Sequence, residues 1–362
     1  MTKDEEKTMI TCSNLQELKD ARGKCLSEII DCITFESVNC SAIDMGIGSG
    51  VLAIQLKKKF IDLKITGIDK DISYISQLLT SSNISDINLL EEDILDTSLA
   101  DNFAEIVLFF NMIRHLPKKD LRPALLEAKR VLSQNGNIYI FESYPQPSTK
   151  AQDLLWDVYC LENELEERAG NVPEAFYQPD EIKTELYQIG FLVKQISIFD
   201  EHTISLPPDV WENKKKDFEE MCQNYSKDEL KKVSQKIQKL DDQIKTNGLE
   251  SLPTFVVIAY PANISMGLYP YINKEIKWRV ERDNTLLLYS KVSGLVTLDH
   301  MGGLIWSLSN GERNMDEIAD EVYKLTSMGD LDRIRIDIRA FFLQMYQQDF
   351  ISFHGTPQIQ RP

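Results

Sequence analysis

The chain has 362 residues, which is enough for two domains at the usual size of about 100–200 residues each. It carries 40 basic and 57 acidic residues, and the resulting net charge of −17 argues against general binding to nucleic acid or to an anionic membrane. Apolar runs such as residues 106–110 are far too short to span a bilayer, and residues 1–8 contain no apolar signal-peptide core. We therefore expect a cytoplasmic protein.

The six cysteines include no C-x-x-C pair, which argues against a structural zinc site. In a reducing compartment, free cysteines are usually buried like small apolar residues. We therefore expect core thiols rather than disulfides, and the sequence predicts no metal site.

The first 142 residues alternate between helical and strand patterns. Apolar side chains at three- and four-residue steps predict a helix over residues 13–36. Short apolar strands then alternate with helices, an order typical of right-handed β-α-β units and a mainly parallel sheet. Asn135-Gly136 predicts a turn into the last strand of this series. The predicted strands are 41–45, 64–69, 87–91, 104–111 and 137–142, and the predicted helices are 51–60, 73–82 and 121–132.

Long polar helices dominate the next part of the chain. Residues 148–169 and 178–188 predict helices, and residues 208–247 predict one or two long amphipathic helices. Strand patterns at 191–199 and 254–260 would complete the sheet. A stretch containing proline and glycine follows and predicts a linker over residues 263–272.

The C-terminal part has a pattern of its own, with three short strands and then three helices. Residues 264–362 carry 11 basic and 13 acidic residues, so nearly all of the negative charge belongs to the first part. Three strands and three helices suffice for a small, separate α+β unit. The predicted strands are 275–281, 285–292 and 295–298, and the predicted helices are 301–308, 315–325 and 331–350.

The most specific motif is a D-x-G-x-G-x-G loop between the first strand and the next helix, formed by Asp44, Gly46, Gly48 and Gly50. Glycines serve where backbone turns tightly and approaches a ligand closely. The dinucleotide fingerprint would need a glycine at Val51, and no Gly-Lys-Ser/Thr follows, so neither that motif nor a phosphate-binding P-loop matches. The loop resembles the first motif of class I S-adenosylmethionine-dependent methyltransferases.

Further polar residues follow the next strands at the spacing of that family. Asp69 ends the second strand, Asp93-Ile94 follow the third, and Asn111 ends the fourth. The resemblance implies a Rossmann-like seven-stranded sheet and S-adenosyl-L-methionine as cofactor. Ligands of such sheets lie outside the carboxyl ends of the strands. For Asp93, a helix cap or turn role is an alternative. The implied cofactor-binding residues are Asp44, Gly46, Gly48, Gly50, Asp69, Asp93, Ile94 and Asn111.

Three residues near the same edge are candidates for proton transfer, and for each a structural role is the alternative. His115 follows the fourth strand and titrates near neutrality, so it is the first candidate base. Glu142 and Tyr144 follow the fifth strand and are secondary candidates. Residues 148–178 and 200–253 exceed a minimal catalytic domain, and we expect them to form a helical lid over the acceptor pocket. The acceptor atom is not readable from the sequence.

Residues 298–318, together with the preceding strands and the last helix, resemble the PqqD-like domain, also called the RiPP recognition element. The resemblance implies a small winged-helix-like module that binds the leader of a ribosomally made precursor peptide. The leader would add as a strand along Val296 and Leu298, and Arg335 and Arg339 would meet its acidic residues. A solvated helix face is the alternative for the arginines. DNA binding is disfavoured because the module has no basic excess.

Together these patterns predict a methyltransferase domain over residues 1–262 and a leader-binding domain over residues 273–355. The predicted function is methylation of a precursor peptide, with no nucleic acid or membrane as partner. One alternative is a small-molecule methyltransferase whose C-terminal module serves dimerisation or regulation, and a homodimer stays open. Another is a non-catalytic peptide-binding scaffold, against which the intact glycine loop speaks.

Overall fold

The computed structural model describes residues 26–27, 29–34, 40–82, 87–200, 204–223, 225–262, 264–283, 285–326 and 330–356. Most of the helix predicted over residues 13–36 lies outside these ranges. The chain forms two compact units. The first contains residues 1–179 and 195–258, and the second contains residues 180–194 and 259–362.

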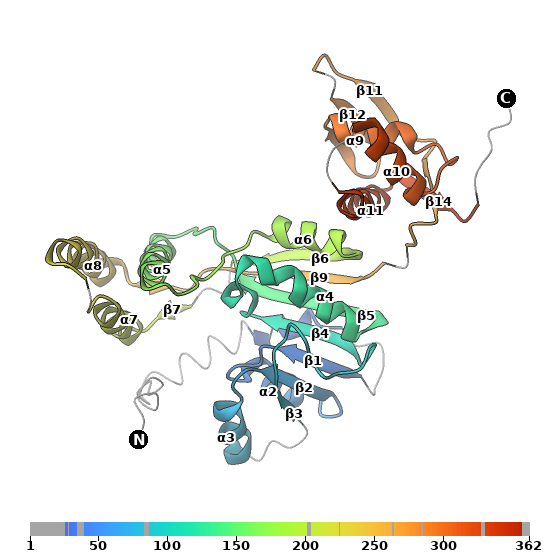
Figure 1. The fold of residues 1–362 in the computed structure, drawn as a ribbon. Coiled ribbons are helices and arrows are strands. Elements are labelled where there is room, and N and C mark those ends of the chain that lie inside the picture. The colour runs from blue at the N-terminus through green and yellow to red at the C-terminus, as the bar shows by residue number, and fades with distance from the viewer. Residues whose placement is uncertain are drawn as a thin grey trace. The chain divides into compact units, whose positions relative to one another are not determined.

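A seven-stranded sheet with the order β3-β2-β1-β4-β5-β9-β6 is the central element (Figure 1). The pairs β1–β2, β2–β3, β1–β4 and β4–β5 are parallel. The strand order reverses between β1 and β4, which places a ligand crevice at their carboxyl ends. The predicted Rossmann-like α/β fold is therefore confirmed. The strands are β1 Ser41–Met45, β2 Lys64–Asp69, β3 Ile87–Glu91, β4 Ala104–Phe110, β5 Leu132–Ser143, β6 Phe191–Phe199 and β9 Thr254–Pro261.

The middle strands of this sheet are buried on both faces. In β4, Val107, Leu108 and Phe109 are fully buried, and β5 contributes Tyr139 and Phe141 to the same core. Such continuous apolar runs are typical of parallel strands that are covered on both sides. The connecting helices are α2 Val51–Lys59, α3 Ser73–Ser82 and α4 Leu121–Val131. The predicted order of helices and strands between residues 41 and 132 is confirmed.

The turn predicted at Asn135-Gly136 is wrong, because both residues lie inside β5. The pairing register between β4 and β5 shifts between Ala104 and Ile106. A Cβ on Gly136 would lie 2.6 Å from the carbonyl oxygen of Glu105. The glycine therefore allows the two backbones to approach closely at an irregular pairing, a role that local turn statistics do not distinguish from a turn.

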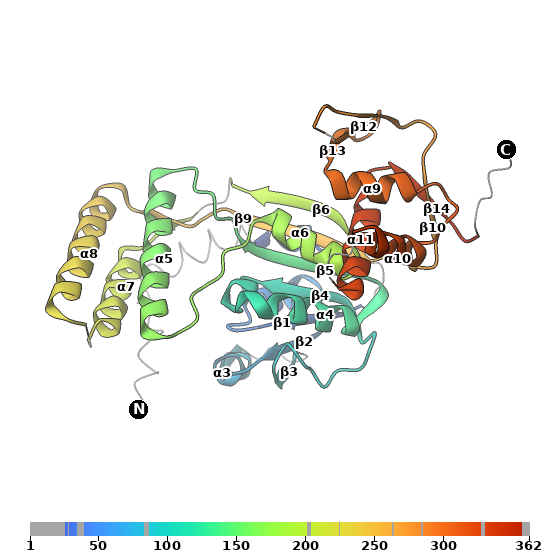
Figure 2. The same ribbon diagram turned by 45° about the horizontal axis from the view of Figure 1, so that its top comes forward.

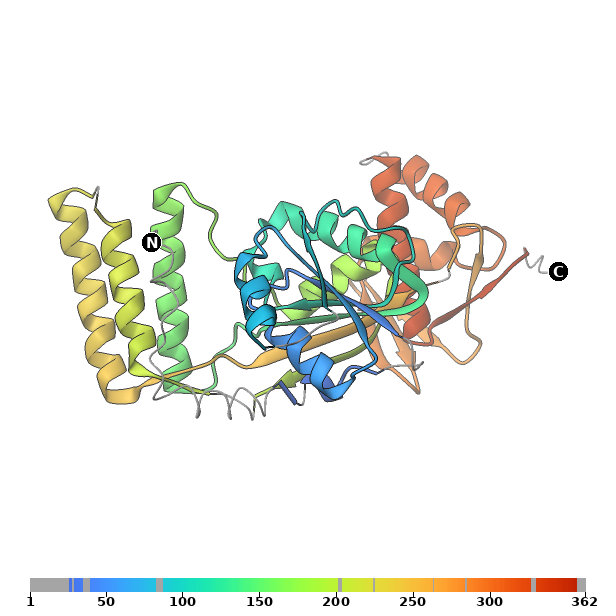
Figure 3. The ribbon, with the colours of Figure 1, turned by 90° about the horizontal axis from the view of Figure 1, so that it is seen from below.

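Three long helices pack side by side as a bundle, α5 Lys150–Ala169, α7 Pro208–Met221 and α8 Lys227–Asn247 (Figure 3). The indole of Trp211 donates a 2.9 Å hydrogen bond to Asp241 within this bundle. Lys245, Lys215 and that indole hydrogen bond to Asp241 and lower its pKa. Two short strands pair with each other at the base of α7 and α8 in the sequence: β7 Ser205–Leu206 comes just before α7, and β8 Leu249–Glu250 comes just after α8.

The second unit contains α6 Pro179–Gln188 and a three-stranded antiparallel sheet with the order β11-β12-β13. Three helices pack together with this sheet (Figure 2). The strands are β11 Lys277–Val280, β12 Leu286–Ser290 and β13 Gly294–Leu298, and the helices are α9 His300–Leu308, α10 Met315–Thr326 and α11 Leu331–Gln347. The predicted winged-helix-like arrangement of three strands and three helices is present.

A second strand pair in this unit was not predicted. β10 Tyr269–Ile272 pairs with β14 Ile351–His354 in antiparallel fashion, and the ring of Tyr271 stacks on His354 at 4.1 Å. β10 lies in the stretch that the sequence indicated as a linker, and β14 begins just after the last helix, which ends earlier than predicted. Asp349 ends that helical segment with a positive φ of 60°. No helix in the described ranges is long and apolar enough to cross a membrane.

Candidate active site

The glycine loop and the loop after β4 touch each other at the carboxyl edge of the sheet. Gly46, Gly48 and Gly50 all have positive φ, between 49° and 77°. A Cβ on Gly46 would lie 2.2 Å from Cγ of Met112, and one on Gly50 would lie 2.1 Å from Cδ1 of Ile75. Backbone conformation therefore disfavours a side chain at all three glycines, and space also excludes one at Gly46 and Gly50. The three glycines form a cradle in which the backbone can approach a ligand.

Two buried polar oxygens in this cradle have no partner. The side chain of Asp44 is 2% exposed, and burial together with the nearby Asp69 raises the pKa of Asp44 to about 7. Oδ1 of Asp44 and Oδ1 of Asn111 are buried without a hydrogen-bond partner among the described residues. Asn111 also has a positive φ of 51°, and its amide donates to the carbonyl of Phe141. Two unsatisfied acceptors at one edge fit a ligand that supplies donors.

Asp69 lies at the end of β2 beside the same loop. Its Oδ2 accepts the amide hydrogen of Gly48 at 2.8 Å, and its Oδ1 accepts that of Asp71 at 3.3 Å. A carboxylate has about four acceptor positions, so capacity for ribose hydroxyls remains. The structure therefore places Asp69 where the resemblance implies it.

The acid after β3 makes local contacts. Asp93 accepts the amide hydrogen of Leu95 at 3.1 Å and forms a 3.1 Å ion pair with Lys70. The first contact is the turn role considered above as an alternative. Ile94 is buried, with 4% exposure. Even with both contacts formed, the side chain of Asp93 is half-exposed, and it lies just after the carboxyl end of β3.

The loop after β4 forms a short 3-10 turn, Ile113–His115. Its Arg114 contacts Glu142 near the end of β5. Glu142 is fully buried, and its two oxygens accept the amide hydrogens of Arg114 and Ser143. Nε of Arg114 lies 3.8 Å from Oε1 of Glu142. Burial raises the pKa of Glu142, against the opposing charge of Arg114. Because Glu142 is fully buried, a role in holding Arg114 fits it better than contact with a methyl acceptor.

The other two candidate acid–base residues lie closer to the surface. His115 is half-exposed, and Nδ1 of its ring lies 3.1 Å from Oε1 of Glu174. The hydroxyl of Tyr144 donates to Gln146 at 2.7 Å, and its ring packs edge-on against Phe255. Tyr144 therefore has partners of its own and does not contact His115 in the described hydrogen-bond network.

Glu174 was not singled out by the sequence. It lies in the coil between α5 and α6, where no motif marks it. Only the fold brings it to the loop after β4, because the amide of Ala175 donates to the carbonyl of Arg114 at 2.7 Å. No local pattern could have indicated this contact between residues so far apart in the chain.

Aromatic side chains from α5 and the following coil pack next to this loop. Phe176 lies against Trp156 and Tyr159, with ring centroids 4.9 and 5.2 Å away. The Arg114 guanidinium lies 6.0 Å from the centre of the Tyr159 ring. Trp211, in contrast, is buried in the helix bundle with Asp241 and does not line this region. The described residues include no group of three or more potential metal ligands.

In the second unit, β13 pairs with β12 alone among the described strands, so one of its edges is open. Leu298 is buried in the core and Val296 packs partly against it, while Leu295 is 63% exposed on the opposite face. The open edge predicted along Val296 and Leu298 therefore exists in the described part of the chain.

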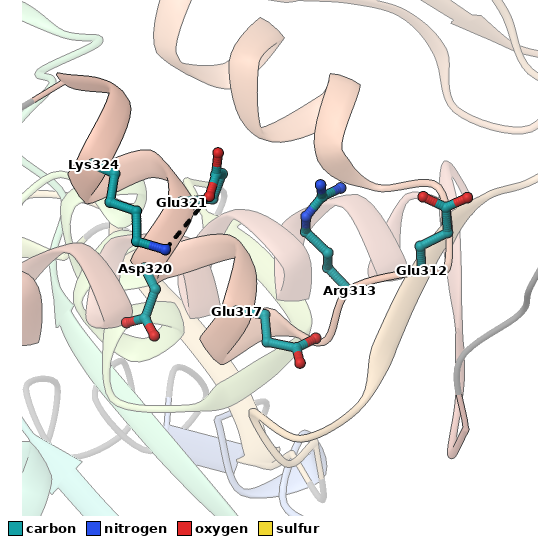
Figure 4. Close-up of a pocket in the computed structure, with 6 residues that line it drawn as sticks. All are labelled: Glu312, Arg313, Glu317, Asp320, Glu321 and Lys324. Carbon is teal, nitrogen blue, oxygen red and sulfur yellow. Dashed lines mark ion pairs between the residues drawn. The ribbon is translucent and has the colours of Figure 1, made fainter.

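The two arginines of α11 differ in their surroundings. Arg335 forms ion pairs of 3.3–3.4 Å with Asp316, Asp320 and Asp332. Arg339 is half-buried, and its Nε has no hydrogen-bond partner among the described residues. Figure 4 shows a shallow pocket at α10 and the turn before it, lined by Glu312, Arg313, Glu317, Asp320, Glu321 and Lys324.

Comparison with known families identifies two domains in the chain. Residues 42–136 match the model of a methyltransferase domain, and residues 284–351 match the model of coenzyme PQQ synthesis protein D (PqqD). The first match covers the glycine loop, Asp69, Asp93, Asn111 and His115. The second covers β12 through the start of β14.

Solved structures that are similar to this chain include the following three. A cyclopropane-fatty-acyl-phospholipid synthase-like protein from Lactobacillus casei ATCC 334 is 15% identical, with a TM-score of 0.54 over 69% of this chain and 94% of its own. A SAM-dependent methyltransferase from Aquifex aeolicus is 18% identical, with a TM-score of 0.39 over 51% of this chain and 90% of its own. Phosphoethanolamine N-methyltransferase 2 from Haemonchus contortus, in complex with S-adenosyl-L-methionine, is 12% identical, with a TM-score of 0.42 over 66% and 53%.

A comparison with curated proteins found no match to this chain. The two orphaned oxygens and the side-chain-free glycine cradle fit S-adenosyl-L-methionine, the cofactor of this enzyme class. The chain is therefore an S-adenosylmethionine-dependent methyltransferase with a PqqD-like domain in its C-terminal part.

Proposed function

We propose that this enzyme methylates a ribosomally synthesised precursor peptide whose leader is captured by the PqqD-like domain, residues 273–355. The observation that carries the proposal is the open edge of β13 in a domain that matches PqqD. An extended peptide can add to such an edge through main-chain hydrogen bonds, with alternate side chains giving specificity. Leader capture would raise the effective concentration of the core peptide near the cofactor.

The leader would lie along Val296 and Leu298 as a fourth strand of the sheet. The exposed side chain of Leu295 would then contact the leader side chains that lie opposite it on the outer face of the sheet. Arg339 would supply a positive charge for an acidic leader residue, since its Nε has no hydrogen-bond partner in the described chain. Arg335 already has three aspartates around it and would contribute less.

At the catalytic edge, we assign each cofactor-binding residue by its geometry. Asp69 would accept hydrogen bonds from the ribose hydroxyls, and Asp44 and Asn111 would offer their orphaned oxygens to donors of the methionine part. Gly46, Gly48 and Gly50 would let the backbone approach the ligand, and Asp93 with Ile94 would contact the adenine ring. Bound S-adenosylmethionine supplies an activated methyl group on a sulfonium.

The chain's own residues must then orient the acceptor and exclude water. The half-exposed His115 is the candidate base. Glu142 accepts the amide hydrogen of the neighbouring Arg114 and so fixes its position. The aromatic group of Trp156, Tyr159 and Phe176 provides an apolar wall beside them. We expect residues 148–178 and 200–253 to cover the acceptor.

The test begins with a search for a short open reading frame next to this gene. The peptide that it encodes is incubated with enzyme and S-adenosylmethionine and analysed by mass spectrometry. We expect the full peptide to gain 14-Da increments, as each methyl group replaces a hydrogen, and the leaderless peptide to react at least about tenfold more slowly. Equal methylation with and without the leader would contradict leader capture and favour a small-acceptor enzyme with an accessory module.

A pair of matched variants locates the peptide on the sheet. Leu295 on β13 and Val280 on β11 are almost equally exposed, at 63% and 61%, on the two opposite edge strands. We expect Leu295→Asp to weaken binding of a fluorescent leader peptide about tenfold by fluorescence anisotropy, because it places a charge in the apolar contact. Val280→Asp should leave the affinity unchanged. Weaker binding by Val280→Asp, with unchanged binding by Leu295→Asp, would indicate that the peptide adds to β11 instead.

A further inference from the structure

The other edge strand of the small sheet, β11, is also open. It pairs with β12 alone among the described strands, and all of its residues, Lys277–Val280, are exposed. Trp278 and Val280 are 55% and 61% exposed, although the residues opposite them on β12, Leu288 and Leu286, are buried in the core. Directly opposite residues share a face of a sheet, so the apolar core side of this sheet continues onto β11 without cover.

The pairing of β11 with β12 determines which backbone groups face the open edge. The amide of Glu281 donates to the carbonyl of Thr285 at 2.8 Å, in the same register as the strand pair. In an antiparallel pair every second residue exchanges hydrogen bonds with the neighbouring strand, so Arg279 also turns its N–H and C=O towards β12. The N–H and C=O groups of Trp278 and Val280 therefore point to the open edge. A strand that is added there must bond to these two residues.

The side chains of this edge are complementary to those of a second copy that runs antiparallel. A two-fold axis through Arg279 places Trp278 opposite Val280 of the second copy, and Lys277 opposite its Glu281. Each of these pairs occurs twice, because the contact is symmetric. Lys277 forms no ion pair with another described residue, so its charge is available for this contact. The two copies would thus join an apolar cluster on one face and two ion pairs on the other.

Charged residues on an edge strand usually prevent pairing with other strands, and here they select one register. A shift by one pair towards the start of β11 would place Lys277 opposite Arg279, which is repulsive. A shift in the other direction would need residues 282 and 283, which form a turn. In the favoured register the two copies of Arg279 lie opposite each other, but Nε of each already contacts Oε1 of its own Glu281 at 2.6 Å, which offsets the like charges.

We propose that β11 is a self-association surface, along which two copies of this chain join their three-stranded sheets into one continuous antiparallel sheet. The β13 edges then lie at the two ends of the joined sheet and stay free. The inference goes beyond the proposed function and does not rest on it. The paired stretch is short, and interfaces below about 1,200 Å² are usually weak, so we expect a dissociation constant of roughly 10–100 μM for the dimer.

Sedimentation equilibrium of the full chain, without cofactor or peptide, measures this association. We expect the wild type to change from monomer to dimer across that concentration range. Val280→Asp should raise the dissociation constant at least about tenfold, because it places a charge opposite Trp278 of the second copy. Leu295→Asp, at the equally exposed position on β13, is the matched control and should leave the constant unchanged. Circular dichroism of both variants verifies that they are folded.

A pair of charge reversals tests the register. Lys277→Glu alone places Glu opposite Glu281, and Glu281→Lys alone places Lys opposite Lys277, so each variant should self-associate about tenfold more weakly than wild type. An equimolar mixture of the two variants should form heterodimers, because opposite charges then meet at both pairs.

Three results would overturn the proposal. The first is a wild-type chain that stays monomeric at about 500 μM, well above the expected dissociation constant. The second is association that is lost in Leu295→Asp and kept in Val280→Asp, which would place the contact on β13. The third is a mixture of the charge variants that associates no better than either variant alone. None of these results bears on methylation or leader binding, so the proposed function is tested separately.

Discussion

The carboxyl edge of the large sheet and the open edge of β13 differ in the groups that they offer to a ligand. At the large sheet, Asp44 and Asn111 are buried with oxygens that no described residue satisfies. In the C-terminal domain, β13 offers exposed backbone, and Arg335 of α11 is already paired with three aspartates. The first region is built for a ligand with specific donors and the second for an extended chain.

This difference has an energetic consequence. Buried acceptors without partners destabilise the free protein, so the cofactor region should gain stability when its ligand binds. An open strand edge remains hydrated and costs the folded state little. Variants in the two regions should therefore affect stability and binding in different proportions.

The largest expected effect is on stability, through Asp44→Asn. A carboxyl group whose pKa is raised from 3.8 to about 7 stabilises the fold fully only below pH 4, and this contribution is lost as pH rises through 7. A neutral amide avoids the loss, so we expect the cofactor-free variant to be more stable than wild type by about 4 kcal/mol at pH 8. Its advantage should vanish near pH 4. Urea unfolding at both pH values measures this.

The same variant should bind S-adenosylmethionine more weakly, which sharpens the contrast between stability and function. Asp62→Asn is the control, because Asp62 is exposed in the turn before β2 and its replacement should change stability by less than about 0.5 kcal/mol. An Asp44→Asn protein that is less stable than wild type at pH 8 would contradict the desolvation argument.

The next effect is on cofactor affinity, through Gly46→Ala. The added Cβ would combine a positive φ of 77° with a contact of 2.2 Å to Met112, so we expect about 100-fold weaker binding of S-adenosylmethionine by calorimetry. Gly170→Ala is the matched control. Its φ is 81°, but nothing lies within 4 Å of the new atom, so it should lose stability and keep its cofactor affinity.

If Gly46→Ala and Gly170→Ala weaken cofactor binding equally, the loss comes from general destabilisation rather than from the cradle. That result would show that the close contact between the glycine loop and Met112 does not determine cofactor affinity. Thermal unfolding of both variants shows whether their losses of stability are comparable.

The smallest effect is expected at the surface of α11. We expect Arg339→Gln to weaken binding of an acidic leader peptide about fivefold, the size of one partly exposed ion pair. Arg335→Gln should change the affinity less than about twofold, because its partners are Asp316, Asp320 and Asp332 of the same domain. Anisotropy at two salt concentrations measures both. A larger loss at Arg335 would show that the leader displaces those aspartates.

Much of the fold was predictable because its signals are local. The apolar strands, the glycine loop and the polar residue at each strand end repeat a pattern that short stretches of chain carry by themselves. The turn at Asn135-Gly136 was wrong because the same dipeptide also serves a close backbone approach between β4 and β5. β10 and β14 were missed because each is stabilised mainly by the other, and their paired residues, from Tyr269 with His354 to Ile272 with Ile351, lie far apart in the chain.

The site divides in the same way. The sequence by itself determined the enzyme class, the cofactor and the positions of Asp44, Asp69 and Asn111, because local strand patterns place these residues at the carboxyl ends of β1, β2 and β4. Only the tertiary structure decided that Glu142 is buried behind Arg114 and that Glu174 meets His115. Those contacts join segments that are far apart in the chain. A local sequence pattern encodes neither the burial of a side chain nor the distant residue that it contacts.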